Sequence, residues 1–233
     1  MQFLAGTSGF SYDEWKGVFY PEDLPADARL AYYAEQLPAV EINNTFYRMP
    51  KRSVLEKWRE AVPPGFRFSI KASRRITHQK KLQDIAEPMG YLARNLETLG
   101  DRLGVVLFQL PPYLRYEPER LTEWLRELPE DLPACLEVRH GSWLCDGVFE
   151  RLAGRNVALV VNDDEEAEAE IRTTADFGYL RLRRSCYDDS DLDAWVSRCA
   201  AQGWSRALVF FKHEEEGAGP KLAQRFLERA DAA

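Results

Sequence analysis

Val40-Glu41-Ile42-Asn43-Asn44 is the stretch that decides the fold, because a short apolar run ends there in residues able to bind or catalyse. The same form recurs in residues 68–71, 106–109, 136–140 and 159–163, each of which carries apolar residues and ends in polar ones. Strands of a parallel sheet are buried on both faces, so packing does not explain a charge at their carboxyl ends. The series therefore predicts a parallel sheet with a functional site along that edge.

Eight apolar runs are expected to form strands. They lie at residues 3–7, 39–44, 66–71, 104–110, 134–139, 157–162, 178–183 and 206–212. Helices are expected between them at 26–37, 51–61, 84–100, 118–128, 189–202 and 219–230. This alternation predicts a single domain over residues 1–233 with a compact TIM-type (β/α)8 barrel of the α/β class. Residues 164–176 offer only a weak acidic helix, so one outer helix is expected to be missing or stunted.

An open doubly wound sheet is the alternative fold. That fold normally has fewer strands and a glycine-rich first turn. Residues 6–12 contain two glycines but lack the G-x-G-x-x-G spacing, and they are expected to open a long loop. The sequence pattern therefore favours the barrel.

The charge balance argues against a protein drawn to nucleic acid by its overall field. The 233 residues include 31 Lys and Arg against 38 Asp and Glu, a net charge of -7. Binding of a polyanion would therefore need a local basic patch. The sequence shows no signal-type leader and no apolar run of membrane length, so we expect a cytoplasmic protein without a membrane partner.

Polar residues at the strand ends are expected to form one layer at the top of the barrel. Side chains alternate along a strand, so residues two apart share a face. The layer is expected to contain Glu41, Asn43, Lys71, Gln109, Glu137, Arg139, Asp163 or Asn162, Arg181, Arg183 and Lys212. Its cations leave capacity for a carboxylate or phosphate of a ligand. The alternative is a self-neutralising layer of salt bridges that only plugs the barrel.

Loops at the same edge add charge and aromatic surface. Residues 72–81 contain four cations and His78, which favours anion capture, with a solvated surface loop as the alternative. Tyr47 and Trp143 belong to aromatic groups that follow the second and fifth strands. The favoured interpretation is that they are core residues under long loops, and the alternative, for which both are kept as candidate site residues, is that they stack a sugar or base.

No metal or cofactor is predicted from the motifs. The three histidines are His78, His140 and His213, and the acids able to join them are Glu41, Glu137 and Asp163. No H-x-H or H-x-x-x-H pair is present, but convergence from separate strands is not visible in spacing, so a divalent metal stays as an alternative. G-x-S-x-G and Walker motifs are absent as well.

Several long motifs follow one another along nearly the whole chain. They are Gly6-Thr7-Ser8-Gly9-Phe10-Ser11-Tyr12 with Trp15 and Phe19-Tyr20-Pro21, Val40 to Tyr47, Lys71-Ala72 with Ile76-Thr77-His78, Gln109-Leu110-Pro111-Pro112, and Glu137-Val138-Arg139-His140 with Ser142-Trp143. Together they resemble the domain of unknown function 72 family, also called YecE-like. The resemblance implies a TIM-type barrel and no established reaction. The fold is also similar to endonuclease IV and sugar isomerase barrels, by analogy only.

The carboxyl-terminal part departs from the pattern of that family. Relatives tend to read Arg-Leu-His-Gly where this chain has Arg181-Leu182-Arg183-Arg184, and they tend to have paired asparagines where it has Lys212-His213. Both changes add positive charge. They favour an anionic ligand.

These observations favour an enzyme that acts on an anionic ligand such as a phosphate ester or a phosphorylated sugar or nucleoside. Glu137 or Glu41 would act as general base, and His140 or His78 would transfer a proton. Lys71 and the arginines of the layer would stabilise developing negative charge. The alternatives are a non-catalytic module that binds nucleic acid or nucleotide and a metal-dependent phosphodiesterase resembling endonuclease IV. The sequence predicts no oligomeric state.

Overall fold

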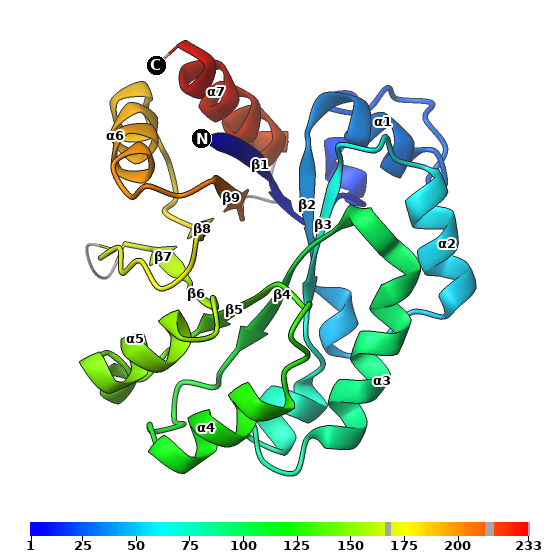
Figure 1. Cartoon of the computed structure of the whole chain (residues 1–233). Coiled ribbons are helices and arrows are strands. Elements are labelled where there is room, and N and C mark those ends of the chain that lie inside the picture. The colour runs from blue at the N-terminus through cyan, green and yellow to red at the C-terminus, as the bar shows by residue number, and fades with distance from the viewer. Residues whose placement is uncertain (166–168, 213–216, 233) are drawn as a thin grey trace.

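The structure, a computed structural model, describes residues 1–165, 169–212 and 217–232. Within these residues nine parallel strands form one sheet in the order β6-β5-β4-β3-β2-β1-β9-β8-β7 (Figure 1). The strands are β1 (Gln2–Ser8), β2 (Ala39–Ile42), β3 (Arg67–Lys71), β4 (Leu103–Gln109), β5 (Ala134–Glu137), β6 (Ala158–Leu159), β7 (Val161–Asp163), β8 (Phe177–Leu182) and β9 (Arg206–Phe211). Each apolar run that predicted a strand contains one.

The sheet is nearly closed because its two edge strands are consecutive pieces of one chain segment. β6 pairs with β5, and after Val160 the chain continues as β7, which pairs with β8. The two pieces occupy one position, so the nine strands fill the eight positions of a (β/α)8 barrel. The predicted TIM-type barrel is confirmed, and the alternative of an open doubly wound sheet is wrong.

Helices surround the barrel on its outside (Figure 1). The α-helices are α1 (Arg29–Gln36), α2 (Arg52–Glu60), α3 (Ala86–Leu96), α4 (Pro118–Glu127), α5 (Asp146–Ala153), α6 (Asp189–Ala200) and α7 (Ala218–Ala232). Shorter helical turns are η1 (Asp13–Trp15), η2 (Asn44–Phe46), η3 (Arg75–Gln79), η4 (Glu97–Arg102) and η5 (Gly141–Trp143). The sequence pattern did not predict α5. Between β7 and β8, the described residues 164–165 and 169–176 contain no helix, which agrees with the expected missing outer helix.

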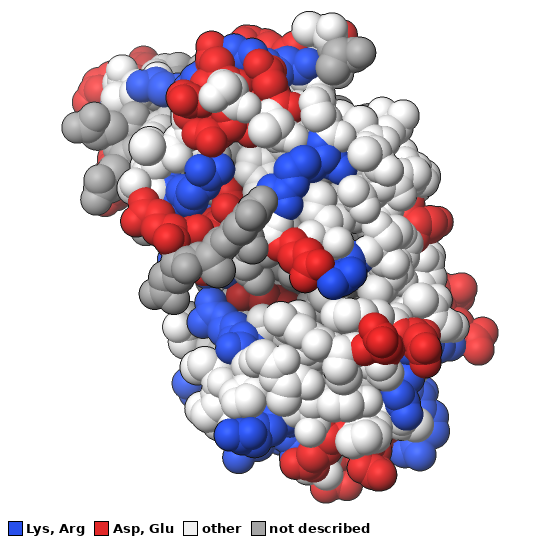
Figure 2. Space-filling view, turned by 90° about the vertical axis from the view of Figure 1, so that its left-hand side faces the viewer, with Lys and Arg blue, Asp and Glu red and all other residues white. Residues whose placement is uncertain are grey.

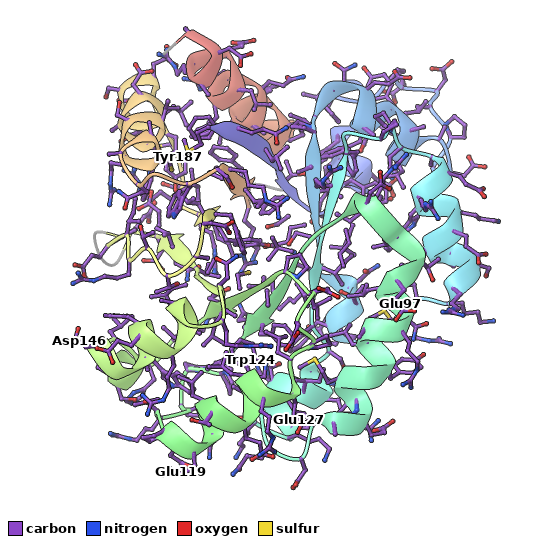
Figure 3. All side chains as sticks on the ribbon, in the orientation of Figure 1. Glu97, Glu119, Trp124, Glu127, Asp146 and Tyr187 are labelled. Atoms are coloured by element: carbon purple, nitrogen blue, oxygen red, sulfur yellow. The ribbon has the colours of Figure 1, made fainter. Side chains whose placement is uncertain are left out.

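Each outer helix turns an apolar face to the sheet, as α4 illustrates. Pro118 starts the helix, where its missing N–H leaves no hydrogen bond unmade. Trp124 is fully buried, and its ring meets that of Phe108 of β4 edge to face, with 5.2 Å between the centroids. Figure 3 shows Trp124 on the sheet side of α4 and Glu119 on the outer side. This packing fixes β4, the strand that ends in Gln109.

The barrel interior is apolar in its lower part and polar at the carboxyl ends of the strands. Its apolar part consists of Leu4, Ala39, Val105, Leu107, Cys135, Ala158, Val160, Phe177, Tyr179, Leu208 and Phe210. Cys135 and Glu137 are two residues apart on β5 and share the inward face, as do Leu107 and Gln109 on β4. The alternation along the strands therefore points their polar ends into the top of the barrel.

Candidate functional site

Two carboxylates and one arginine form the base of the candidate site. Glu41 of β2 and Glu137 of β5 are excluded from solvent, with side chains at most 1% exposed. Arg181 of β8 bridges them, with Nη2 2.9 Å from Oε1 of Glu41 and Nη1 2.6 Å from Oε2 of Glu137. Because a buried charge needs a partner, each of the three depends on the others. We call these three residues the charged floor.

Glu137 is surrounded by hydrogen-bond donors. Gln109 Nε2 lies 2.8 Å from both carboxylate oxygens, Arg183 Nη2 lies 2.8 Å from Oε1, and Arg139 Nε lies 3.2 Å from the same atom. Burial opposes ionisation of Glu137, but the arginines, Arg181 first, overcome it and lower its pKa to about 2. Glu137 therefore stays ionised at neutral pH, which does not favour the role of general base.

Glu41 is held in the same way by different donors. Its oxygens accept hydrogen bonds from Ser8 Oγ at 2.7 Å, Asn43 Nδ2 at 2.9 Å and the Tyr179 hydroxyl at 2.8 Å. Burial raises the pKa of Glu41, but Arg181 and these donors together hold it below its ordinary value. Neither glutamate of the charged floor is thus suited to accept a proton.

Lys71 ends β3 and reaches into the space above the charged floor. Its Nζ donates to Oε1 of Gln109 at 2.8 Å and lies 4.6 Å from the centroid of the Phe46 ring. Within the described residues it forms no ion pair. Burial, and then the positive charge of Arg181, lowers the pKa of Lys71 to about 8. The amine therefore loses its proton more readily than an ordinary lysine does.

His78 lies beside Lys71 on the turn η3. Its ring meets that of Phe46 edge to face at 4.9 Å, and its Nδ1 lies 2.9 Å from the Thr77 hydroxyl. Burial first, and then the charges of Lys71 and Arg139, lower the pKa of His78. The imidazole is therefore neutral at neutral pH and able to receive or pass on a proton.

These residues surround a cavity of about 390 Å³ at the carboxyl end of the barrel. It is lined by Ser8, Tyr12, Asn43, Phe46, Tyr47, Lys71, His78, Gln109, Arg139, Arg181, Arg183 and Lys212. Five of these are Lys or Arg and none is acidic, while the two carboxylates of the charged floor lie directly beneath. With Lys71 protonated, five positive charges face two negative ones, so the cavity carries an excess of positive charge.

The face of the protein that carries α5 and α6 differs from the cavity in its distribution of charge. Figure 2 shows basic and acidic side chains interspersed on the face that carries α5 and α6. Ion pairs on that side include Arg229 of α7 with Asp193 of α6, whose Nη1 and Oδ1 are 2.8 Å apart. This face is therefore not a continuous basic surface, unlike the lining of the cavity.

Most of the site residues expected from the sequence meet at this cavity. Asn43, Tyr47, Lys71, His78, Gln109, Arg139, Arg181, Arg183 and Lys212 line it, and Glu41 and Glu137 lie beneath. Tyr47 is 71% exposed, so its ring is accessible to a ligand. Thr45, two residues earlier in the chain, is buried. The polar strand ends therefore converge as the alternation predicts.

Three expected site residues do not reach the cavity. Trp143 is fully buried and its Nε1 donates to the Leu114 carbonyl at 2.8 Å, so it is a core residue and its ring is closed to a ligand. Asp163 accepts hydrogen bonds from three side chains, those of Arg184, Tyr187 and Trp195. His140 caps the turn η5 by accepting from the backbone N–H of Ser142 at 3.1 Å.

Several residues of the site were not singled out from the sequence. Ser8 ends β1, and its place at a strand end was the available signal. Phe46 lies beside Tyr47 after the second strand and Tyr12 follows the first strand, and their spacing does not distinguish a core ring from a ring in the cavity. Tyr179 reads as an ordinary strand residue, although its hydroxyl donates to Glu41 at 2.8 Å.

Two further expectations concern a metal ion and a membrane. Among residues 1–165, 169–212 and 217–232, no three His, Cys, Asp or Glu side chains come together in a way that could hold a metal ion. His213, one of the histidines considered as a ligand, lies outside these ranges. None of the helices in the described part of the chain is long and apolar enough to cross a membrane.

Known proteins resemble this chain in sequence or in structure. The UPF0759 protein YecE of Escherichia coli K12 is 31% identical over 129 residues, which is 55% of this chain and 47% of YecE. The chain thus spans about half the length of the curated relatives that it matches. The crystal structure of a DUF72 family protein from Thermotoga maritima MSB8 superposes with a TM-score of 0.80 at 25% identity, over 99% of this chain and 100% of the other.

A second solved structure supports the fold alone. It is a DUF72 family protein from Enterococcus faecalis V583, with a TM-score of 0.81 at 18% identity, covering 100% of this chain and 96% of the other. The model of the family described as "Protein of unknown function DUF72" matches residues 4–233, which is almost the whole chain. The chain therefore belongs to the DUF72 family.

Proposed function

We propose that the protein is an enzyme that acts on a small phosphate-bearing molecule bound above the charged floor. The observation that carries the proposal is the lining of the cavity, where five cations lie over two buried carboxylates. Arg and Lys bind phosphate through short, charge-assisted hydrogen bonds. A volume of about 390 Å³ is within the range of small-molecule sites.

The cations divide the work in this proposal. Arg181 is fixed between the two glutamates and sets the shape of the floor. Arg139 and Arg183, whose side chains are 38% and 18% exposed, have surface left for a ligand, and Lys212 is exposed beside them. Lys71 and the neutral His78 are the groups suited to proton transfer.

Binding measurements test this function. Isothermal titration calorimetry should detect inorganic phosphate and glycerol 3-phosphate, whereas glycerol should not bind. Arg139→Gln should weaken the binding of both phosphate compounds about tenfold, or roughly 1.4 kcal/mol in binding free energy, because one charged donor is lost. Lys57→Gln on the outer side of α2 is the matched control and should change nothing. If neither phosphate compound binds, or if Arg139→Gln binds them as the natural protein does, the proposal fails.

A nucleotide or nucleic acid as the ligand is the second candidate, and two cation–aromatic pairs favour it. The Arg74 guanidinium lies 5.9 Å from the Tyr47 ring and the Lys81 ammonium lies 5.6 Å from the Tyr113 ring. Both tyrosines are exposed, at 71% and 63%. Such pairs can stack bases and neutralise phosphates. Binding of a single-stranded oligonucleotide that weakens steeply with salt would support this candidate, and salt-independent binding would reject it.

A further inference from the structure

Lys71 differs from the arginines that line the same cavity. Each of the three arginines forms an ion pair with a buried glutamate. The Nζ of Lys71 instead contacts the amide oxygen of Gln109 at 2.8 Å and faces the Phe46 ring at 4.6 Å. A neutral amide and a ring hold an ammonium less strongly than a carboxylate does. The geometry therefore presents to the cavity an amine whose charged form is not held by a carboxylate.

Burial and the two nearby arginines also favour the neutral form of Lys71, against the two glutamates. Burial is the main cause that lowers its pKa to about 8, Arg181 and Arg139 lower it further, and Glu137 and Glu41 oppose them. At about pH 7.5 a much larger fraction of the Lys71 side chains is then neutral than for a lysine of ordinary pKa near 10.4. Only the neutral amine has a lone pair that can attack carbon.

We infer that Lys71 is a nucleophile that forms an imine with an aldehyde or ketone group of the substrate. The inference rests on the proposed function, since the cations beside Lys71 would hold the phosphate of the same molecule. It narrows the substrate class to phosphate-bearing carbonyl compounds. Lys71 and the neutral His78 line one cavity, so an amine and a proton carrier are available to the same carbonyl group.

The reaction balances without an oxidant or a reductant. The lone pair of Nζ forms a bond to the carbonyl carbon, the C=O π pair moves to oxygen, and a proton passes from nitrogen to oxygen to give a carbinolamine. The hydroxyl then takes up a proton, with His78 as carrier, and leaves as water. The nitrogen lone pair forms the C=N bond and the nitrogen releases its remaining proton. One amine and one carbonyl give one imine and one water.

Reductive trapping tests the inference. The protein is incubated at about pH 7.5 with dihydroxyacetone phosphate and sodium cyanoborohydride, which converts an imine to a stable secondary amine, and the labelled lysines are mapped by peptide mass spectrometry. Because its neutral fraction is larger, Lys71 should be labelled at least about tenfold faster than Lys57, an exposed lysine on α2. Glycerol 3-phosphate, which has the phosphate but no carbonyl, should suppress the labelling.

The outcomes separate the imine from the proposed function. Labelling of Lys71 no faster than that of Lys57, in a protein that binds glycerol 3-phosphate, would overturn the imine and leave the proposed function standing. Absence of both binding and selective labelling would overturn both. Equal labelling of Lys71 by dihydroxyacetone, which lacks the phosphate, would support the nucleophile and contradict the phosphate-bearing substrate.

Discussion

The charged floor and the groups above it balance their charges in different ways. Arg181 contacts both Glu41 and Glu137, and all three side chains are buried. Above them, Lys71 contacts an amide and a ring, Lys212 is exposed, and neither forms an ion pair within the described ranges. Charge thus has two uses within one cavity. The charges of the floor are paired with one another, and in the proposed function the unpaired charges above bind the ligand.

Removal of the bridging residue Arg181 should have the largest effect, which is on the free energy of unfolding. Arg181→Met leaves two buried carboxylates without their shared partner, and we expect a loss of about 3–5 kcal/mol in the free energy of unfolding. Urea unfolding followed by circular dichroism measures it. Arg126→Met is the control, because Arg126 is exposed and its ion pair with Glu127 contributes less than about 1 kcal/mol.

A second substitution identifies the cause of that loss. If the carboxylate of Glu41, left without a cation, is responsible, Glu41→Gln added to Arg181→Met should recover part of the stability, because it removes that buried charge. A double variant less stable than Arg181→Met alone would contradict this explanation.

Low pH should have the second-largest effect, because protonation of Glu137 lowers the free energy of unfolding. The pKa of Glu137 is about 2 in the folded protein, against about 4.3 in an unfolded chain, so the unfolded state takes up the proton first. The stability that Glu137 contributes, about 3 kcal/mol, is complete above about pH 4.3 and is lost as the pH falls towards about 2. Urea unfolding at about pH 6 and pH 3 should show a smaller difference for Glu137→Gln than for the natural protein. Identical differences would speak against an ionised Glu137.

Replacing the unpaired lysine should affect binding more than folding. Lys71→Met removes one positive charge from the cavity, and inorganic phosphate should bind about tenfold more weakly by calorimetry. The free energy of unfolding should not fall by more than about 1 kcal/mol, since no carboxylate loses its partner. Lys57→Met should alter neither quantity. A loss of stability as large as that of Arg181→Met would place Lys71 in the charged floor.

Alkaline pH should act in the opposite direction, through Lys71. The pKa of Lys71 is about 8 in the folded protein, below the value near 10.4 of an unfolded chain, so folding disfavours its charged form. That cost is present below about pH 8 and is relieved as the pH rises towards about 10.4. The melting temperature of the natural protein should therefore rise relative to that of Lys71→Met between about pH 8 and pH 10. A constant difference would indicate an ordinary lysine.

The strands and their inward faces could be predicted because both follow from short patterns. A run such as Val106-Leu107-Phe108-Gln109 contains its own strand signal, and the two-residue period places Gln109 on the same face as Leu107. The convergence of Lys71 and Arg181 then follows from barrel closure alone. The fold and the location of the site are therefore contained in local sequence.

The roles of individual residues depended on partners far away in the chain. Glu137 looks like a general base at a strand end, and only the approach of Arg181 and Arg183 makes it a fixed anion. Trp143 follows a strand as a ligand-stacking ring would, but its loop turns it toward the Leu114 carbonyl. The direction of a loop side chain is decided by packing, which strand periodicity does not encode.

At Val160 the chain passes from β6 to β7, and the sheet is weakly paired there; we call this place the seam of the barrel. The charged floor joins the strands on its two sides. β5 and β8 lie on either side of the position shared by β6 and β7, where β6 forms pairs at two residues and β7 at three. Glu137 of β5 and Arg181 of β8 join across this gap with 2.6 Å between Oε2 and Nη1. A bound anion that draws on Arg181 would thus change how readily the seam opens. Amide hydrogen exchange near Val160 would then report occupancy of the cavity.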